Sequence, residues 1–513
     1  MDELNNQKPN QDNEDHKEVK LNRINVVRHK WPDEIAAEKR RTRVRILIIL
    51  LCIGCFVLGY VISGANNKTQ STTNTNSETK LSTDKLNQVY EIMKDKWYFG
   101  KDIQNLNSTL LENAIKGMVK NDADTHTEYL NASDATSLTN SLSGSFVGIG
   151  ILLYDSGDYC GIDKVYIDSP AEKVGMQPGD IIIKVDGVSV KGWSTAKLAN
   201  KVRGDKGTKV TVEVKRGNTT KTFKVTRDNI NVSSYGYIDA NGNGVLQLDS
   251  FADTTADEVG KYLANFKKHD VKKLIIDLRN NGGGYVDTAV EIASYLLDKD
   301  SVIIYEKDKA GNSEAVKVNN DTTRYHFDKM AVLVNNQTAS ASEILATALK
   351  AHLNCEIVGV QSYGKATIQN TMQFTDGSYF KYTIYEWLTA DKQAINKKGI
   401  TPDYVVKLDD ALTYSFSDDD KSYKVDSVGN SVKDAQILLK FLGYGVDRKD
   451  GYFSNATLNA VKQFQSDKGL TVTGVIDSDL KNSLSSYAVQ YWHDQKTKLD
   501  SQMQKAVEVV DGK

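Results

Sequence analysis

The fold follows from one stretch of the sequence, which reads Met330-Ala331-Val332-Leu333-Val334-Asn335-Asn336-Gln337-Thr338-Ala339-Ser340-Ala341-Ser342-Glu343-Ile344-Leu345. Its first five residues are apolar and predict a buried strand, and the residues from Ile344 to Leu349 predict a helix. Ser340 at this turn is a candidate nucleophile, because the backbone N–H groups at a helix N-terminus favour negative charge. Ser340 and Glu343 also fit a capping box, which has a purely structural role. The stretch alone leaves both interpretations open.

A nucleophilic serine needs a base, and no histidine is placed to serve. His352 is twelve residues beyond Ser340, which along a helix means ~18 Å. His326 and His269 each precede a predicted strand, so both are expected at the far end of the sheet. Lys365 follows the next predicted strand, but a lysine acts as a base only when burial lowers its pKa. A solvated surface lysine is the alternative.

A second buried strand, from Lys272, leads into the glycine loop Asn281-Gly282-Gly283-Gly284 and then into a helix predicted over 286–297. A strand, a glycine loop and a helix also occur in nucleotide sites. However, neither Gly-x-Gly-x-x-Gly nor Gly-Lys-Ser/Thr is present here. The loop is therefore expected to offer free N–H groups to an anion.

The chain has 513 residues and a formal net charge of −2, which predicts several domains and gives no reason to expect nucleic acid. Residues 1–45 are polar and predict a disordered cytoplasmic tail that ends in the basic run Lys39 to Arg45. The apolar run that follows predicts a transmembrane helix over 46–65, with all later residues outside the cell. A cleaved signal peptide is the alternative, and a lipoprotein cysteine at Cys55 is a weaker one. Residues 66–80 are rich in Ser, Thr and Asn and predict a linker.

The four cysteines form neither a disulfide framework nor a set with zinc-ligand spacing, so we expect no metal and no cofactor. Two of them, Cys52 and Cys55, fall in the predicted membrane helix. The other two, Cys160 and Cys355, fall in different predicted domains.

Residues 81–142 predict a helical segment, and 143–228 change to short β-rich segments separated by turns. Within the second region, the stretch from Ser169 through Gly175-Met176-Gln177-Pro178-Gly179-Asp180 to Gly187 resembles a PDZ domain. The resemblance implies that a ligand C-terminus adds as a strand and that backbone N–H groups capture its carboxylate. The loop Gly148-Ile149-Gly150-Ile151 is expected to bind it. The alternative is a β-domain without a ligand.

After a linker at 411–425, residues 426–487 resemble the three-helix peptidoglycan-binding module. Its ordered features are a helix over 432–442, Asp450-Gly451-Tyr452-Phe453, the helix from Thr457 to Gln465, and Gly469-Leu470-Thr471-Val472-Thr473-Gly474. The final residues, 488–513, are polar and predict a helix-prone tail.

The central region, 229–410 with the preceding helical segment, resembles the carboxyl-terminal processing (tail-specific) serine peptidases. Four groups of residues carry the resemblance: Ser340 and Lys365, twenty-five residues apart; Leu278 to Gly284; Gly399-Ile400-Thr401-Pro402-Asp403; and, near the N-terminus, Ala114 to Met118 with Asp124 to Tyr129. The departures are small: Thr125 replaces a usual proline, Gln337-Thr338 stand where Gly-Ser is frequent, and Ala366 replaces a common glycine.

The resemblance implies a Ser–Lys mechanism in which Lys365 takes the proton of Ser340 and Gln369 orients the lysine. It implies an oxyanion hole made by the N–H groups of Ala341 and Gly283. Ser342 lacks the spacing to Lys365 and is assigned to helix structure. Separately, we hypothesise that Arg203, in the loop before a PDZ strand, reports peptide binding to the protease core.

The sequence thus predicts a multidomain α+β protein: a membrane-anchored serine endopeptidase on the outside of a bacterial cell membrane. It is expected to bind the C-terminal tails of proteins through the PDZ domain and peptidoglycan through the C-terminal module. The resemblance is compatible with a homodimer, although no residue fixes the oligomeric state. A peptidoglycan hydrolase and a non-enzymatic PDZ scaffold are the rival functions. The first lacks a catalytic constellation in the sequence, and the second is disfavoured by the intact Ser340, Lys365 and Gln369.

Overall fold

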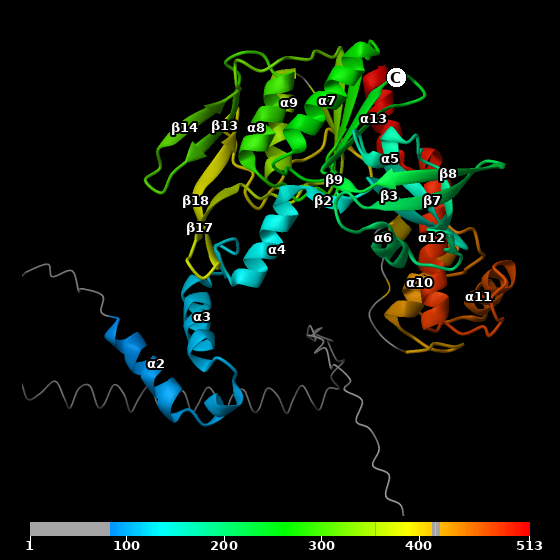
Figure 1. Ribbon diagram of the computed structural model, residues 1–513, viewed down its shortest axis with the longest axis horizontal. Coiled ribbons are helices and arrows are strands. Elements are labelled where there is room, and N and C mark those ends of the chain that lie inside the picture. The colour runs from blue at the N-terminus through cyan, green and yellow to red at the C-terminus, as the bar shows by residue number, and fades with distance from the viewer. Residues whose placement is uncertain (1–82, 354, 413–415, 417–420, 513) are drawn as a thin grey trace, which may run out of the picture. The chain divides into compact units, whose positions relative to one another are not determined.

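The computed structural model describes residues 83–353, 355–412, 416 and 421–512 (Figure 1). Residues 1–87 and 88–513 form two separate units. Of the first unit only residues 83–87 are described, and they begin helix α2 (Asp84–Lys96). The predicted cytoplasmic tail, transmembrane helix and linker (1–80) lie outside the described residues. No helix in the described part is both long and apolar enough to cross a membrane.

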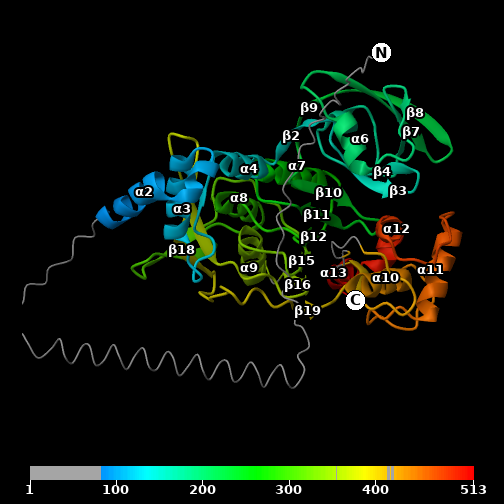
Figure 2. The same cartoon turned by 90° about the horizontal axis from the view of Figure 1, so that it is seen from below.

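A six-stranded sheet forms the centre of the protease core. Its strand order is β10-β11-β12-β15-β16-β19, and Figure 2 shows the strands in that sequence. The first pair is antiparallel and the other four pairs are parallel. The strands are β10 (Ser234–Ile238), β11 (Gly244–Leu248), β12 (Lys273–Asp277), β15 (Lys329–Val334), β16 (Glu356–Gly359) and β19 (Tyr404–Val405). The carboxyl ends of the parallel strands therefore lie along one edge, where α/β proteins place their functional loops.

The two faces of this sheet pack against different helices, because successive side chains of a strand point to opposite faces. One face carries Leu274, Ile276 and Val332, which pack with the helices α7 (Thr255–Lys268), α8 (Val286–Leu296) and α9 (Ala341–Leu353). The other face carries Ile275, Ala331 and Leu333, which pack with Ala506 and Val510 of helix α13 (Ser501–Asp511).

A second sheet joins the N-terminal segment to the core. Its order is β1-β18-β13-β14, with β17 also paired to β18. The strands are β1 (Glu128–Leu130), β13 (Val302–Lys307), β14 (Ser313–Lys317), β17 (Thr367–Gln373) and β18 (Tyr379–Thr389). The N-terminal segment also contains η1 (Tyr98–Asp102), α3 (Leu106–Val119) and α4 (Ala132–Ser143). Pairing of β1 with β18 brings residues near 128 beside residues near 381.

The PDZ region enters and leaves the core through the antiparallel pair β2 (Ser145–Gly148) and β9 (Asp228–Asn231). Its own sheet has the order β3-β4-β5-β7-β8, with β6 beside β5. The elements are β3 (Ile151–Ser156), β4 (Tyr159–Val165), α5 (Pro170–Lys173), β5 (Ile181–Val185), β6 (Val188–Ser189), α6 (Thr195–Val202), β7 (Lys209–Arg216) and β8 (Thr219–Thr226). A separate apolar core stabilises this region.

The C-terminal region has its own core, formed by three helices with η2 (Asp410–Leu412) beside them: α10 (Asn430–Phe441), α11 (Asn455–Asp467) and α12 (Ser478–Leu499). Helix α12 continues beyond the matched motif into the polar tail. It contacts the PDZ region there, where the His493 ring stacks on Tyr154 at 3.6 Å and its Nε2 lies 3.0 Å from Asp163. The tail then turns and packs on the core sheet as α13.

Candidate active site

Ser340 lies at the junction between β15 and α9 in a left-handed conformation, with φ of 57°. For a residue with a side chain this conformation costs roughly 1–2 kcal/mol, so the surroundings must hold it. The Ser340 N–H donates to Glu343 Oε2 at 2.9 Å, which is one half of the predicted capping box. The Glu343 N–H donates to the Ser340 carbonyl at 2.8 Å and not to its hydroxyl. The cap therefore leaves the hydroxyl available for chemistry.

Glu343 connects the serine turn to the segment that carries Lys365. Its side chain is fully buried. Oε1 accepts from Ser362 Oγ at 2.5 Å and from Gly364 N at 2.8 Å. Oε2 accepts from Ser340 N and from Lys365 N, each at 2.9 Å. One carboxylate thus fixes the backbone of both candidate catalytic residues, which lie far apart in the sequence.

The surroundings of Lys365 favour its neutral form. Burial lowers the pKa of this lysine, and the positive charge of Lys381 lowers it further. Glu128, Asp124 and Glu343 oppose the shift, but the pKa stays below its ordinary value. A lower pKa increases the fraction of neutral amine near neutral pH, which a general base requires.

Residues of the N-terminal segment also lie near Lys365, and the sequence did not predict this. Asp124 Oδ2 accepts from Thr127 Oγ1 at 2.6 Å, and Thr127 Oγ1 accepts from the N–H of Thr383 at 3.0 Å. Burial lowers the pKa of the His126 imidazole, and the charge of nearby Lys365 lowers it further. The motif around these residues supported the family resemblance, but only the pairing of β1 with β18 shows that it lies near Lys365.

Gln369 lies on β17 and its amide is oriented by two threonines. Its Nε2 donates to Thr367 Oγ1 at 2.9 Å and to Thr383 Oγ1 at 3.2 Å. Because both bonds use the nitrogen, Oε1 remains available for another donor. The described residues include no hydrogen bond between Gln369 and Lys365, so the orienting role of Gln369 stays a prediction.

The glycine loop lies against the serine turn. A Cβ on Gly283 would stand 2.9 Å from Ser340 Cβ and 3.0 Å from the Ala341 nitrogen, and its φ of 100° also favours glycine. The Gly283 N–H donates to Asn281 Oδ1 at 2.8 Å. This N–H must leave Asn281 before it can bind an oxyanion, whereas Ala341 N–H has no hydrogen-bond partner within the described ranges.

Ser342 has a structural contact. Its buried hydroxyl donates to the Asn281 carbonyl at 3.0 Å, which holds the start of the glycine loop against α9. None of the three histidines considered as bases bonds to Ser340. His352 Nε2 contacts the Val302 carbonyl and His269 Nδ1 contacts the Asn265 carbonyl, while His326 has no side-chain hydrogen bond to any other described residue.

The PDZ region has a groove of about 410 Å³ between β3 and α6. Gly148, Ile149, Gly150 and Ile151 line it, together with Arg203, Phe146 and residues of α6. The Arg203 guanidinium lies 5.3 Å from the centre of the Phe146 ring, a cation–π distance. Arg203 therefore faces the groove. Among the described residues no cluster of His, Cys, Asp and Glu is arranged to hold a metal ion.

Each of the three regions matches a known protein family. Peptidase family S41 matches residues 242–406, a PDZ domain matches 161–216, and a peptidoglycan binding domain matches 428–484.

Among individual proteins, a "Probable CtpA-like serine protease" of Staphylococcus aureus (strain COL) is 34% identical over 88% of this chain and 90% of its own length. The protein of the same description from Staphylococcus epidermidis is 33% identical over 89% and 93%. Among solved structures, the photosystem II D1 C-terminal processing protease is 26% identical with a TM-score of 0.37, over 64% of this chain and 94% of that one. The chain therefore belongs to peptidase family S41, the C-terminal processing peptidases, and is a serine peptidase with a PDZ domain and a peptidoglycan binding domain.

Proposed function

We propose that this peptidase uses a Ser340–Lys365 pair. Ser340 Oγ attacks the scissile carbonyl carbon while Lys365 Nζ takes the hydroxyl proton. The peptide C–N bond then breaks, Lys365 protonates the leaving amine, and water releases the acyl group. The observation that carries this proposal is the buried carboxylate of Glu343, which is hydrogen-bonded to the backbone of both residues. The lowered pKa of Lys365 supports it.

The oxyanion that forms during attack is assigned to the N–H groups of Ala341 and Gly283. The two residues are close neighbours, since a Cβ on Gly283 would stand 3.0 Å from the Ala341 nitrogen. The Asn281 side chain holds Gly283 N–H at 2.8 Å until substrate binds. Each donor that meets the developing charge is worth roughly 10²–10³ in kcat.

Substrates are selected by their C-terminal tails in the PDZ groove. The groove has an apolar lining from Ile149 and Ile151, and glycines at 148 and 150 allow a peptide strand to approach closely. Arg203 reports the bound tail to the core. Its cation–π partner is Phe146 on β2, the strand that connects the PDZ region to the core. An Arg203→Ala variant with unchanged basal and tail-stimulated cleavage would remove Arg203 from this role.

The protein acts at the outer side of a bacterial membrane, anchored by the segment 46–65 and bound to cell wall through the C-terminal module. The apolar run and the preceding basic cluster support the anchor, and the match to a peptidoglycan binding domain supports the wall contact.

One experiment tests the function as a whole. The full chain in detergent and its Ser340→Ala form are incubated with an unfolded protein that has an apolar C-terminus, with the same protein ending in Asp-Asp, and with purified cell wall. We expect only the wild type to cleave protein, faster with the apolar tail, and both forms to sediment with wall. Wall solubilisation would favour a hydrolase, and no protein cleavage at all would favour a scaffold.

A further inference from the structure

Arg279 lies two residues before the first residue of the glycine loop, and its guanidinium uses all five N–H donors that an arginine has. Asp277 accepts from Nε at 2.9 Å and from NH2 at 2.7 Å. Asp500 accepts from NH1 at 2.8 Å and from NH2 at 2.9 Å, and Gln502 Oε1 accepts from NH1 at 3.2 Å. Three of the five bonds therefore come from the C-terminal tail, more than two hundred residues away in the sequence.

The tail holds Asp500 in a fixed place. Asp500 ends α12 and begins α13, where its Oδ1 accepts from the N–H of Met503 at 2.9 Å. It is only 1% exposed. Helix α13 is bound to the core sheet by Ala506 and Val510 and, at its far end, by an ion pair between Asp511 and Lys273 at 2.8 Å. The carboxylate is thus presented by a docked helix and not by a free chain end.

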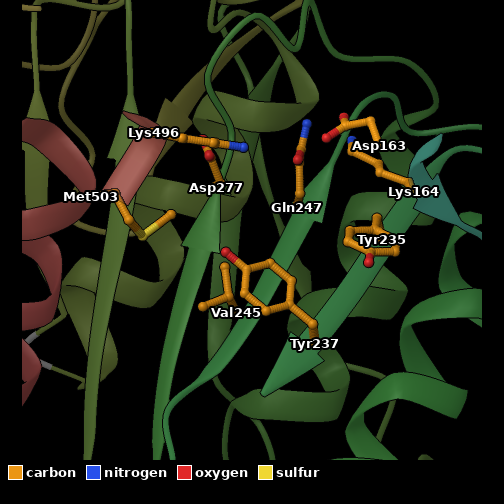
Figure 3. A pocket seen from close by; sticks show the side chains of 9 residues that line it. All are labelled: Asp163, Lys164, Tyr235, Tyr237, Val245, Gln247, Asp277, Lys496 and Met503. Atoms are coloured by element: carbon orange, nitrogen blue, oxygen red, sulfur yellow. The ribbon is translucent and has the colours of Figure 1, made fainter. Parts of the chain in front are cut away.

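The charges where the tail meets the core, those of Arg279, Asp277 and Asp500, depend on one another. Burial lowers the pKa of Arg279, but the carboxylates of Asp277 and Asp500 outweigh burial and raise it, so the guanidinium stays charged. Beside the junction is a cavity of about 170 Å³, and Figure 3 shows Asp277 of the core, Lys496 of α12 and Met503 of α13 among its lining side chains. Removing one partner of a buried ion pair is strongly destabilising, because it leaves an uncompensated buried charge.

The glycine loop connects Arg279 to the turn that carries Ser340. Two residues after Arg279, the Asn281 carbonyl accepts from Ala339 N at 3.1 Å and from Ser342 Oγ at 3.0 Å. Gly283, two residues further on, is in contact with Ser340. A shift of the loop by a fraction of an ångström therefore changes the spacing between the serine and the loop donors.

We propose that Asp500, assisted by Gln502, is a positioning residue for peptide hydrolysis: it fixes Arg279 and thereby the glycine loop beside Ser340. This inference rests on the proposed role of the loop in binding the oxyanion. It makes the geometry of the active site depend on the C-terminal tail, which is continuous through α12 with the peptidoglycan binding domain.

The test compares two tail ion pairs in the full chain. Asp500→Asn keeps the size of the side chain and the cap to Met503 but places an N–H₂ group against the guanidinium. Asp511→Asn is the matched control. It breaks the ion pair with Lys273 at the start of β12, whereas Arg279 follows the end of that strand. We expect Asp500→Asn to lower kcat by roughly 10- to 100-fold with KM within about twofold, because small displacements of reacting groups cost this much. Asp511→Asn is expected to leave both constants within about twofold.

Equal kcat values for the two variants would overturn the proposal, since a merely structural tail would affect both alike. If Asp500→Asn does not fold, Gln502→Met is measured in its place, because it removes the longest of the five guanidinium bonds and, besides that, only the bond from Gln502 Nε2 to the Val406 carbonyl at 2.8 Å. A loss of kcat without a change in KM or in thermal unfolding midpoint supports the role, and an unchanged kcat contradicts it. Lys365→Ala is assayed alongside: activity in that variant would refute the Ser–Lys chemistry, whereas the comparison of the two tail variants would still report on Asp500.

Discussion

Replacement of Glu343 by glutamine tests whether one carboxylate holds the catalytic residues together. Three of its four hydrogen-bond donors are backbone N–H groups, from Ser340, Gly364 and Lys365, and the fourth is the Ser362 hydroxyl. A glutamine amide can accept from only one side. The favoured orientation places its nitrogen toward Ser362, whose oxygen has a lone pair to offer. The Gly364 N–H then has no acceptor.

The cost follows from these contacts. One buried unpaired donor costs about 1–3 kcal/mol, and the two bonds at the other oxygen lose roughly 1 kcal/mol each when the acceptor becomes neutral. We expect Glu343→Gln to lower the free energy of unfolding by about 3–5 kcal/mol. We expect kcat to fall at least ~10-fold, because the anchors of both catalytic residues weaken together.

The measurements are urea unfolding and steady-state cleavage of the apolar-tail substrate. The matched control is Glu258→Gln, a second buried glutamate with four hydrogen bonds, three from hydroxyl groups of Ser233, Ser234 and Thr254. Hydroxyls can turn to accept, and burial already raises the pKa of Glu258, so this variant should lose less stability and keep its kcat. Wild-type kcat in Glu343→Gln, or an equal loss in Glu258→Gln, would show that the Glu343 carboxylate does not hold the catalytic residues in place.

Three further predictions concern neighbours of the serine. Ser342→Ala loses one hydrogen bond to Asn281 and should retain kcat within about tenfold, as measured with the same substrate. Loss of activity only in this variant would show that the nucleophile is Ser342. Lys381→Met removes a charge that lowers the pKa of Lys365, so that pKa rises. Because the base must be neutral, the rise of kcat/KM with pH should move to higher pH, and an unmoved profile would mean that another group titrates. Gly283→Ala places a Cβ within 2.9 Å of the serine Cβ and should abolish cleavage while the PDZ groove still binds peptide by calorimetry; normal turnover would exclude this contact.

The sequence predicted the parts of the core that follow from local pattern. The apolar run before the serine is β15, and the helix predicted after it is α9, although that helix begins at Ala341 and not at Ile344. The loop and helix around 282–297 are present as expected, with α8 ending at Leu296. Such elements are predictable because each one has a periodic apolar face of its own.

The contacts between distant segments were not predictable in the same way. Glu343 was interpreted as a local cap, because nothing in the sequence shows that Gly364 and Lys365 donate to it. The left-handed conformation of Ser340 depends on those same contacts. The tail after Ala488 was interpreted as polar, yet Ala506 and Val510, spaced for one helical face, are buried against the sheet. That spacing was the available signal, but a short amphipathic helix does not indicate which surface covers it.

The central claim, that Ser340 and Lys365 form one catalytic pair, is tested most directly by the cleavage rate of Lys365→Ala beside that of Ser340→Ala, with urea unfolding to show that both variants fold. We expect both rates to fall to the same background at every pH between about 6 and about 9. A Lys365→Ala enzyme that turns over substrate measurably faster than Ser340→Ala would contradict it, because a different group would then be the base.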